Sequence, residues 1–88
     1  MVSVSVTVKE SIGMQNKITP YLIQKANSFK CTVWLEKDER RINAKSLLGV
    51  LSMILTEGME VNVMADGEDE AVAVETISKL LADGYTAE

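Results

Sequence analysis

The sequence predicts an α+β fold in which helices pack on one face of a β-sheet. Valine alternates with serine or threonine at the start of the chain, and apolar residues recur at helical spacing near its end. A charged turn between two short strand-like segments predicts a β-hairpin. In order, the elements read strand, helix, strand, strand, helix, strand, helix, and 88 residues suffice for one domain, 1–88.

The first two elements follow from the residues up to position 29. The alternation from Val2 to Val8 is typical of a strand with one buried face. After a loop over residues 10–16, Thr19 is suited to cap a helix and Pro20 to occupy its first position, where a missing N–H costs nothing. We therefore expect the first helix to begin at about Pro20. Its apolar face comprises Leu22, Ile23, Ala26 and Phe29.

The middle of the chain predicts a hairpin followed by a second helix. Residues 32–36 and 41–44 form the two strands, with residues 37–40 as the turn. Alternation places Cys31, Val33 and Leu35 on one face and Thr32, Trp34 and Glu36 on the other. The second helix is predicted from Ser46 to about Thr56, with Gly58 ending it shortly afterwards.

The last third of the chain predicts a strand and a long helix. The strand runs from Glu60 to Ala65 and ends at the turn pair Asp66-Gly67. The helix runs from Glu68 to about Ala82, because acidic residues in its first turn suit the positive end of the helix dipole. Its predicted buried stripe consists of Ala73, Val74, Ile77, Leu80 and Leu81.

Composition excludes several classes of function. The net charge of −4 gives no surplus of lysine and arginine for binding nucleic acid or an anionic membrane. The chain has no histidine, and its one cysteine, Cys31, cannot form an internal disulfide, so we expect no metal site and no cofactor. Without an apolar run long enough to cross a membrane and without a signal-peptide pattern, we expect a cytoplasmic protein.

Two segments resemble the landmark sites of HPr, the histidine-containing phosphocarrier of the bacterial sugar phosphotransferase system. They are Ile12-Gly13-Met14-Gln15-Asn16-Lys17 and Asn43-Ala44-Lys45-Ser46-Leu47-Leu48-Gly49-Val50. The segments 24–29 and 67–70 also look like family sequence, so the resemblance covers essentially the whole chain. It implies an HPr-like open-faced β-sandwich, with a four-stranded antiparallel sheet covered on one face by three helices.

The first landmark departs from the family pattern. Gln15 stands where the family keeps its phosphoryl-carrying histidine, and a neutral amide has no lone pair basic enough to accept a phosphoryl group. Lys17 replaces an arginine, and Ile18 replaces a proline that appears instead at Pro20. The shifted proline predicts a first helix that begins about two residues late. We therefore expect neither phosphoryl transfer through position 15 nor enzymatic activity.

The second landmark is nearly complete. A basic residue, a serine and an aliphatic run form the family's regulatory-serine pattern, here Lys45-Ser46-Leu47-Leu48. The resemblance implies phosphorylation of Ser46 by the HPr kinase/phosphorylase and docking of the phosphoserine form on catabolite control protein A, a transcription factor. Glutamine at the first site with serine kept at the second is similar to the catabolite-repression branch of the family. Ser46 as a plain, unmodified helix cap is the alternative.

The predicted second helix is apolar around most of its circumference, so some of these side chains should be exposed. Such a patch beside a modifiable serine is suited to protein docking. By resemblance, the partner-facing residues are Gln15, Lys17, Gln24, Leu47, Leu48 and Leu51. Coverage by a second copy in a homodimer is equally open, and the valine-rich first strand could exchange between subunits.

The function predicted from these features is a non-catalytic, HPr-like regulator of carbon catabolite repression. The alternative is a phosphorylation-independent binding module that competes for phosphotransferase partners such as enzyme I. A degenerate carrier with another acceptor is disfavoured, because the loop from Gly13 to Lys17 contains no second nucleophile and no evident general base.

Overall fold

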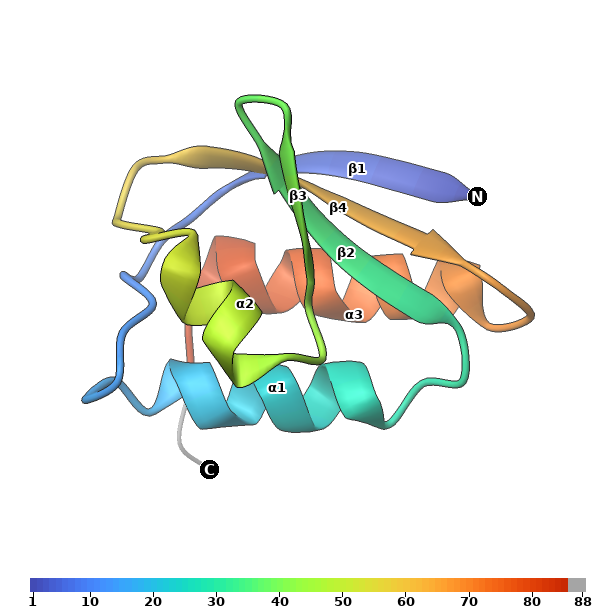
Figure 1. The fold of residues 1–88 in the computed structure, drawn as a ribbon, viewed down its shortest axis with the longest axis horizontal. Helices are drawn as coiled ribbons and strands as arrows, with labels where there is room; N and C mark the ends of the chain where they lie inside the picture. Colours follow the sequence, from blue (N-terminus) through green and yellow to red (C-terminus); the bar gives the residue numbers. More distant parts are fainter. Residues whose placement is uncertain (86–88) are drawn as a thin grey trace.

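A computed structural model describes residues 1–85, so the last three residues of the predicted domain 1–88 lie outside the described part. The element order is the predicted one (Figure 1). All neighbouring strands are antiparallel, in the order β1-β4-β2-β3. The elements are β1 (Val2–Thr7), α1 (Ile18–Asn27), β2 (Thr32–Lys37), β3 (Arg40–Asn43), α2 (Leu47–Ser52), β4 (Glu60–Asp66) and α3 (Glu70–Asp83).

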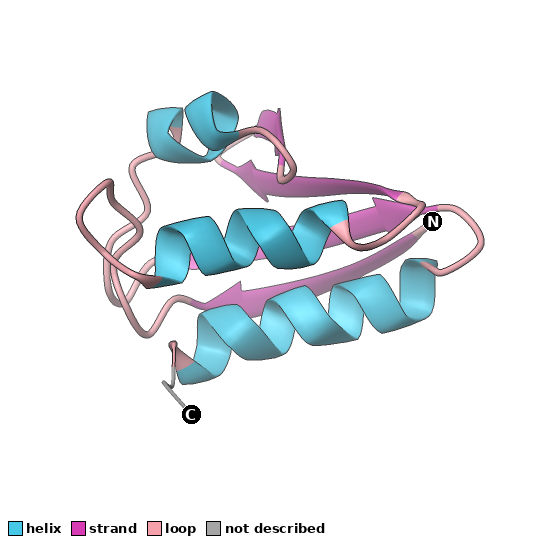
Figure 2. Ribbon diagram, turned by 90° about the horizontal axis from the view of Figure 1, so that it is seen from below, coloured by secondary structure: helices cyan, strands magenta, loops and turns pink. Residues whose placement is uncertain are grey.

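The three helices lie on one face of the sheet, which confirms the open-faced α+β architecture. Figure 2 shows α1 and α3 side by side against the sheet, with α2 at the β3 edge. Strand register sorts the faces: Leu35 is paired with Val63, and both are fully buried beneath the helices. On the open face, Trp34 is half-buried and the Arg41 guanidinium stacks on its ring at 5.3 Å.

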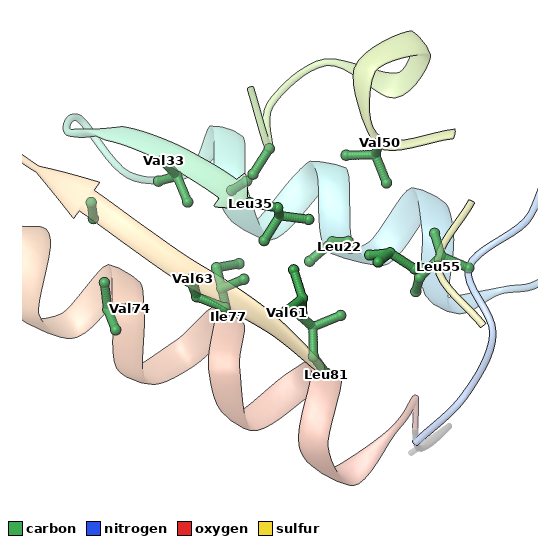
Figure 3. Close-up of a cluster of buried hydrophobic side chains, with 14 of the residues drawn as sticks. Leu22, Val33, Leu35, Val50, Leu55, Val61, Val63, Val74, Ile77 and Leu81 are labelled. Carbon is green, nitrogen blue, oxygen red and sulfur yellow. The ribbon is translucent and has the colours of Figure 1, made fainter. Parts of the chain in front are cut away.

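The core fills the space between the sheet and the helices (Figure 3). Residues from every helix and from the two central strands contribute to it, which gives the layers one continuous hydrophobic contact. The predicted stripe of α3 is confirmed at four positions, while Leu80 is only partly buried. The largest fully buried side chains include Ile18, Leu22, Leu35, Leu55, Ile77 and Leu81.

The predicted start of α1 at Pro20 is wrong, as is the expected late start. The helix begins at Ile18, with Lys17 in the cap position and no side-chain cap. Thr19 does not cap the helix. Its hydroxyl reaches back to the preceding loop, donating to the carbonyl of Gly13 at 2.6 Å and accepting from the Gly13 N–H at 3.0 Å. Pro20 is tolerated because the first-turn amides have no partner within the helix.

The second helix is shorter than predicted: α2 ends at Ser52 instead of about Thr56. Met53 and Leu55 are buried, which continues the apolar pattern in irregular chain. Ile54 leaves the helix with a φ of +51°, a left-handed conformation that costs a β-branched residue free energy. The chain just past the end of the helix therefore contains a strained residue whose side chain is mostly in solvent.

The other boundaries move by one or two residues. The β2–β3 turn is tighter than predicted and consists of Asp38 and Glu39, both at positive φ, as a type I′ turn requires. Helix α3 begins at Glu70 instead of Glu68. Asp69, in its cap position, points its carboxylate away from the helix and accepts from the N–H groups of Lys30 and Cys31, at 2.9 Å each.

Candidate functional site

Ser46 caps the N-terminus of α2, as the sequence predicts. Its backbone is extended, with φ −102° and ψ 119°, and its Oγ accepts from the N–H of Gly49 at 3.1 Å. The residue is half-buried. Because Oγ is the acceptor in this partly buried bond, the hydroxyl proton is not used by it.

The chain before Ser46 is held by Asn43 at the end of β3. The main-chain carbonyl of Asn43 accepts from the Ser46 N–H at 3.0 Å, and its side-chain oxygen accepts from the Lys45 N–H at 2.8 Å. Strand β3 therefore passes directly into the cap of α2, with no free loop between them. This local order positions the serine hydroxyl.

The loop before α1 carries the other predicted site residues. Gln15 and Lys17 are both exposed. Within residues 1–85, neither side chain makes a hydrogen bond or an ion pair, so both are available to a partner. The loop itself is closed by the two bonds between Thr19 and Gly13 and by a bond from the Asn16 amide to the carbonyl of Ser11.

A shallow apolar groove of about 350 Å³ joins this loop to the two helices. It brings the predicted residues Gln24, from α1, and Leu47, from α2, to one place. Gln15 and Lys17 do not line the groove, although they are close in sequence to residues that do. Leu48 and Leu51 do not line it either. The lining residues are Met14, Thr19, Pro20, Ile23, Gln24 and Leu47.

Four of these lining residues were not predicted to face a partner: Met14, Thr19, Pro20 and Ile23. Met14 is 81% exposed, and a large apolar residue beside Gln15 in a loop was a signal available in the sequence. Ile23 gave no such signal, because its helical spacing assigns it to the buried face of α1.

The predicted exposure of apolar side chains on α2 is confirmed. Leu47 is 46% exposed and Leu48 82%, while Leu51 is half-buried. Ile54, just past the helix, is 69% exposed and extends the apolar surface in a way the sequence did not reveal. The residues that directly follow Ser46 therefore present an apolar surface.

The one cysteine is not part of this site. Burial raises the pKa of the Cys31 thiol, and the neighbouring Asp69 carboxylate raises it further, so little thiolate forms near neutral pH. The hydrogen bonds that Asp69 accepts, first from the Lys30 N–H, lower the pKa of its carboxyl group. The pair holds the α1–β2 connection against the start of α3.

No helix formed by residues 1–85 has both the length and the apolar character needed to cross a membrane.

Comparison with known sequences gives matches along nearly the whole chain. The profile of a family described as the PTS HPr component phosphorylation site matches residues 2–83. The HPr-like protein Crh of Bacillus subtilis (strain 168) is 40% identical over 78 residues, which span 89% of this chain and 92% of that protein. The phosphocarrier protein HPr of Neisseria meningitidis is 30% identical over 88 residues, 100% of this chain and 98% of that protein.

Solved structures give the same picture. HPr-C-His from Thermoanaerobacter tengcongensis superposes with a TM-score of 0.85 at 31% identity, covering 92% of this chain and 91% of that one. The crystal structure of Bacillus subtilis Crh superposes with a TM-score of 0.75 at 36% identity, covering 99% and 100%. That structure is described as revealing an unexpected swapping domain in a dimer. A further structure is described as an HPr dimer from Thermoanaerobacter tengcongensis.

Proposed function

Because this chain belongs to the HPr family, we propose that it is a non-catalytic regulator that is phosphorylated at Ser46. The HPr kinase/phosphorylase adds the phosphate from ATP, and the phosphoserine form binds a transcription factor of the catabolite-control type. The protein acts in the cytoplasm and requires no cofactor. The observation that carries the proposal is Ser46 Oγ at the head of α2, beside exposed leucines.

The absence of a phosphoryl carrier supports a regulatory role over a relay. The chain contains no histidine, and Gln15 offers only a neutral amide at the surface of the loop. A neutral amide is a weak nucleophile and forms no stable phosphoryl adduct. Lys17 adds a single charge where a guanidinium would give a planar pair of donors.

The setting of Ser46 supports modification without unfolding. The residue is half-buried and makes one side-chain hydrogen bond, through its oxygen. A phosphate would add roughly −1.5 to −2 charges next to the first amides of α2. The fold loses at most the cap bond, because Oγ remains as the ester oxygen, while the local charge becomes strongly negative.

The surface around Ser46 supports protein docking. Leu47 and Leu48 are exposed beside the serine, with Leu51 partly accessible, and Gln15, Lys17 and Gln24 are exposed polar residues of α1 and the loop before it. An apolar surface next to a switchable anion lets one partner distinguish the modified from the unmodified form. We assign these six residues to the partner-binding surface.

The second candidate function is binding that does not depend on phosphorylation. The groove between Met14 and Leu47 exists without a phosphate, which favours a module that competes for enzyme I or another phosphotransferase partner. Self-association is a related candidate, because dimers are described for Crh and for an HPr. In a homodimer the exposed leucines of α2 would be covered by the second copy.

The proposal is tested by incubating the protein with HPr kinase/phosphorylase and ATP and measuring its intact mass. We expect one added phosphate, which is absent in a Ser46→Ala variant. Pull-down with a catabolite-control transcription factor should then capture the modified form only. If wild-type protein stays unmodified, the proposal is wrong. Equal capture of wild-type and Ser46→Ala protein by enzyme I would favour the competing module.

A further inference from the structure

The peptide bond between Lys45 and Ser46 is held at both of its polar atoms. Its carbonyl oxygen accepts from Nδ2 of Asn27, the last residue of α1, at 3.1 Å. Its N–H donates to the carbonyl of Asn43 at 3.0 Å. A peptide unit is planar, so fixing both atoms fixes the direction in which the chain enters Ser46. With this plane fixed, the direction of Oγ depends only on rotations within Ser46 itself, which the bond from the Gly49 N–H restrains.

Asn27 also ties this peptide to the wall of the groove. The same Nδ2 donates to the carbonyl of Ile23 at 2.9 Å, one turn back in α1. Ile23 lines the groove opposite Leu47, the first residue of α2. One amide group therefore connects the α1 side of the groove to the residue that precedes the serine. Figure 1 shows the connection from β3 to α2 passing beside α1.

The side chain of Lys45 makes a second link to the end of α1. Its Nζ donates to the carbonyl of Phe29 at 2.7 Å, in a partly buried position beyond the C-terminus of the helix. The ammonium also lies near enough to Cys31 to oppose, weakly, the rise in the pKa of that thiol caused by burial and by Asp69. Both observations place the charge of Lys45 against the α1–β2 connection, where it satisfies a carbonyl group.

We infer that Asn27 and Lys45 form a clamp on the end of α1 that sets the direction of the Ser46 hydroxyl, so that Lys45 is a positioning residue and not a charge presented to the kinase. This inference deepens the proposed function and, for its kinase readout, rests on it. Lys45, the basic residue of the Lys45-Ser46 pair, then affects phosphorylation by positioning Ser46. Loss of the hydrogen bond from Asn27 or of the one from the Lys45 side chain lets the 45–46 peptide change its orientation. The Ser46 Oγ then samples a wider range of directions.

The first test uses amide hydrogen exchange and needs no kinase. The Gly49 N–H reports the cap because it donates to Ser46 Oγ, and the Leu35 N–H in β2 reports global opening. In Asn27→Ala and in Lys45→Met, Gly49 should exchange about fivefold faster relative to Leu35, the effect of losing one hydrogen bond. Lys25→Met, which removes a charge elsewhere on α1, should change nothing. Unchanged Gly49 protection in both variants would overturn the clamp.

The second test measures phosphorylation kinetics with HPr kinase/phosphorylase and ATP. A clamp predicts that Asn27→Ala and Lys45→Met each lower kcat about fivefold with KM unchanged, because the hydroxyl direction matters in the transition state. The double variant should be little worse than either one, since both act on one peptide. A recognition charge predicts a raised KM for Lys45→Met and a normal Asn27→Ala, which would refute the inference. Should wild-type protein stay unmodified, the proposed function fails, and the exchange test still decides the clamp.

Discussion

The loop of residues 11–19 is closed by a side chain that reaches back from α1, whereas the segment of residues 43–49 is held by its own cap and by both ends of one peptide unit. In the first region Thr19 binds the main chain of Gly13, and the side chains of Gln15 and Lys17 are left exposed. In the second region the serine itself takes part in the local hydrogen bonding.

In the first region, the residue that holds the backbone is not one of the exposed residues at the loop tip; in the second region, one residue has both roles. The first loop keeps a defined form because a buried threonine outside its tip holds it, so replacing the residues at the tip alters its chemistry without opening it. At the second site the group proposed for phosphorylation and the group that caps α2 are the same hydroxyl. Substitutions of Ser46 should alter both the stability of the domain and its phosphorylation. Substitutions in the loop of residues 11–19 should alter either the stability or the surface chemistry, but not both.

Thr19→Val should give the largest loss of stability. Thr19 is 1% exposed, and valine would leave the Gly13 N–H without its partner and remove one of the two hydrogen bonds that the Gly13 carbonyl accepts, the other coming from the Asn16 N–H. We expect the free energy of unfolding to fall by about 2 kcal/mol in urea titrations. Thr19→Ser, which keeps the hydroxyl, is the control and should lose much less. Equal losses in the two variants would mean that packing, not hydrogen bonding, closes the loop.

Ser46→Ala should cost less, about 1 kcal/mol of unfolding free energy, because one cap bond to the Gly49 N–H is lost. Ser46→Thr keeps the oxygen and should stay close to wild type in the same urea titration. The exchange of the loop amides between Ser11 and Thr19 should not change. A change there would show that the two regions are not independent.

Ile54→Asn should stabilise the protein slightly, by about 0.5–1 kcal/mol, because asparagine tolerates the left-handed backbone better than a β-branched residue. Thermal unfolding measures the gain, and Ile54→Val is the control, since it keeps the strain. The two ends of α2 then differ sharply: the N-terminus is well capped, and the C-terminus is strained. A loss of stability in Ile54→Asn would mean that the exposed isoleucine makes contacts that offset its backbone cost.

The smallest expected effect is on the pH dependence of stability, at the α1–β2 connection that the Lys45 side chain contacts. Hydrogen bonds from the N–H groups of Lys30 and Cys31 lower the pKa of Asp69, so the ionised carboxylate favours the folded state. This contribution is present above the ordinary aspartate pKa of 3.8 and is lost as pH falls through the lower folded value.

Asp69→Asn should therefore flatten the acid side of a plot of melting temperature against pH, measured from about pH 6 to pH 2. Glu68→Gln, which removes an exposed charge next to it, is the control and should keep the wild-type slope. Parallel curves for Asp69→Asn and wild type would contradict this role of the carboxylate.

The sequence predicted the strands and the faces of β2 well, because alternation of apolar residues depends directly on the pleat of the sheet. The predicted buried valine face of β1 is only partly confirmed, because Val4 in this edge strand is 40% exposed. The sequence-based prediction failed where the pattern around a residue fits one structural role and the residue has another in the fold. Thr19 followed by Pro20 has the pattern of a helix start, yet the hydroxyl of Thr19 is used by the loop. Leu55 continues the apolar pattern of α2, yet it is buried from irregular chain. Local periodicity does not distinguish these cases.

The site shows the same limit. Ser46 was predictable as a cap, and the apolar excess of α2 predicted its exposed leucines. The groove was not predictable, because Met14 and Ile23 meet only when the loop folds back onto α1. Nor did the sequence reveal that the Asn27 side chain binds the carbonyl of Lys45, since the two residues lie eighteen positions apart.

The most direct test is to treat the protein separately with HPr kinase/phosphorylase plus ATP and with enzyme I plus phosphoenolpyruvate, and to compare intact masses before and after acid. We predict one acid-stable phosphate on Ser46 in the first reaction and none in the second. An acid-labile phosphate acquired from enzyme I, or an unmodified Ser46 in the first reaction, would contradict the account.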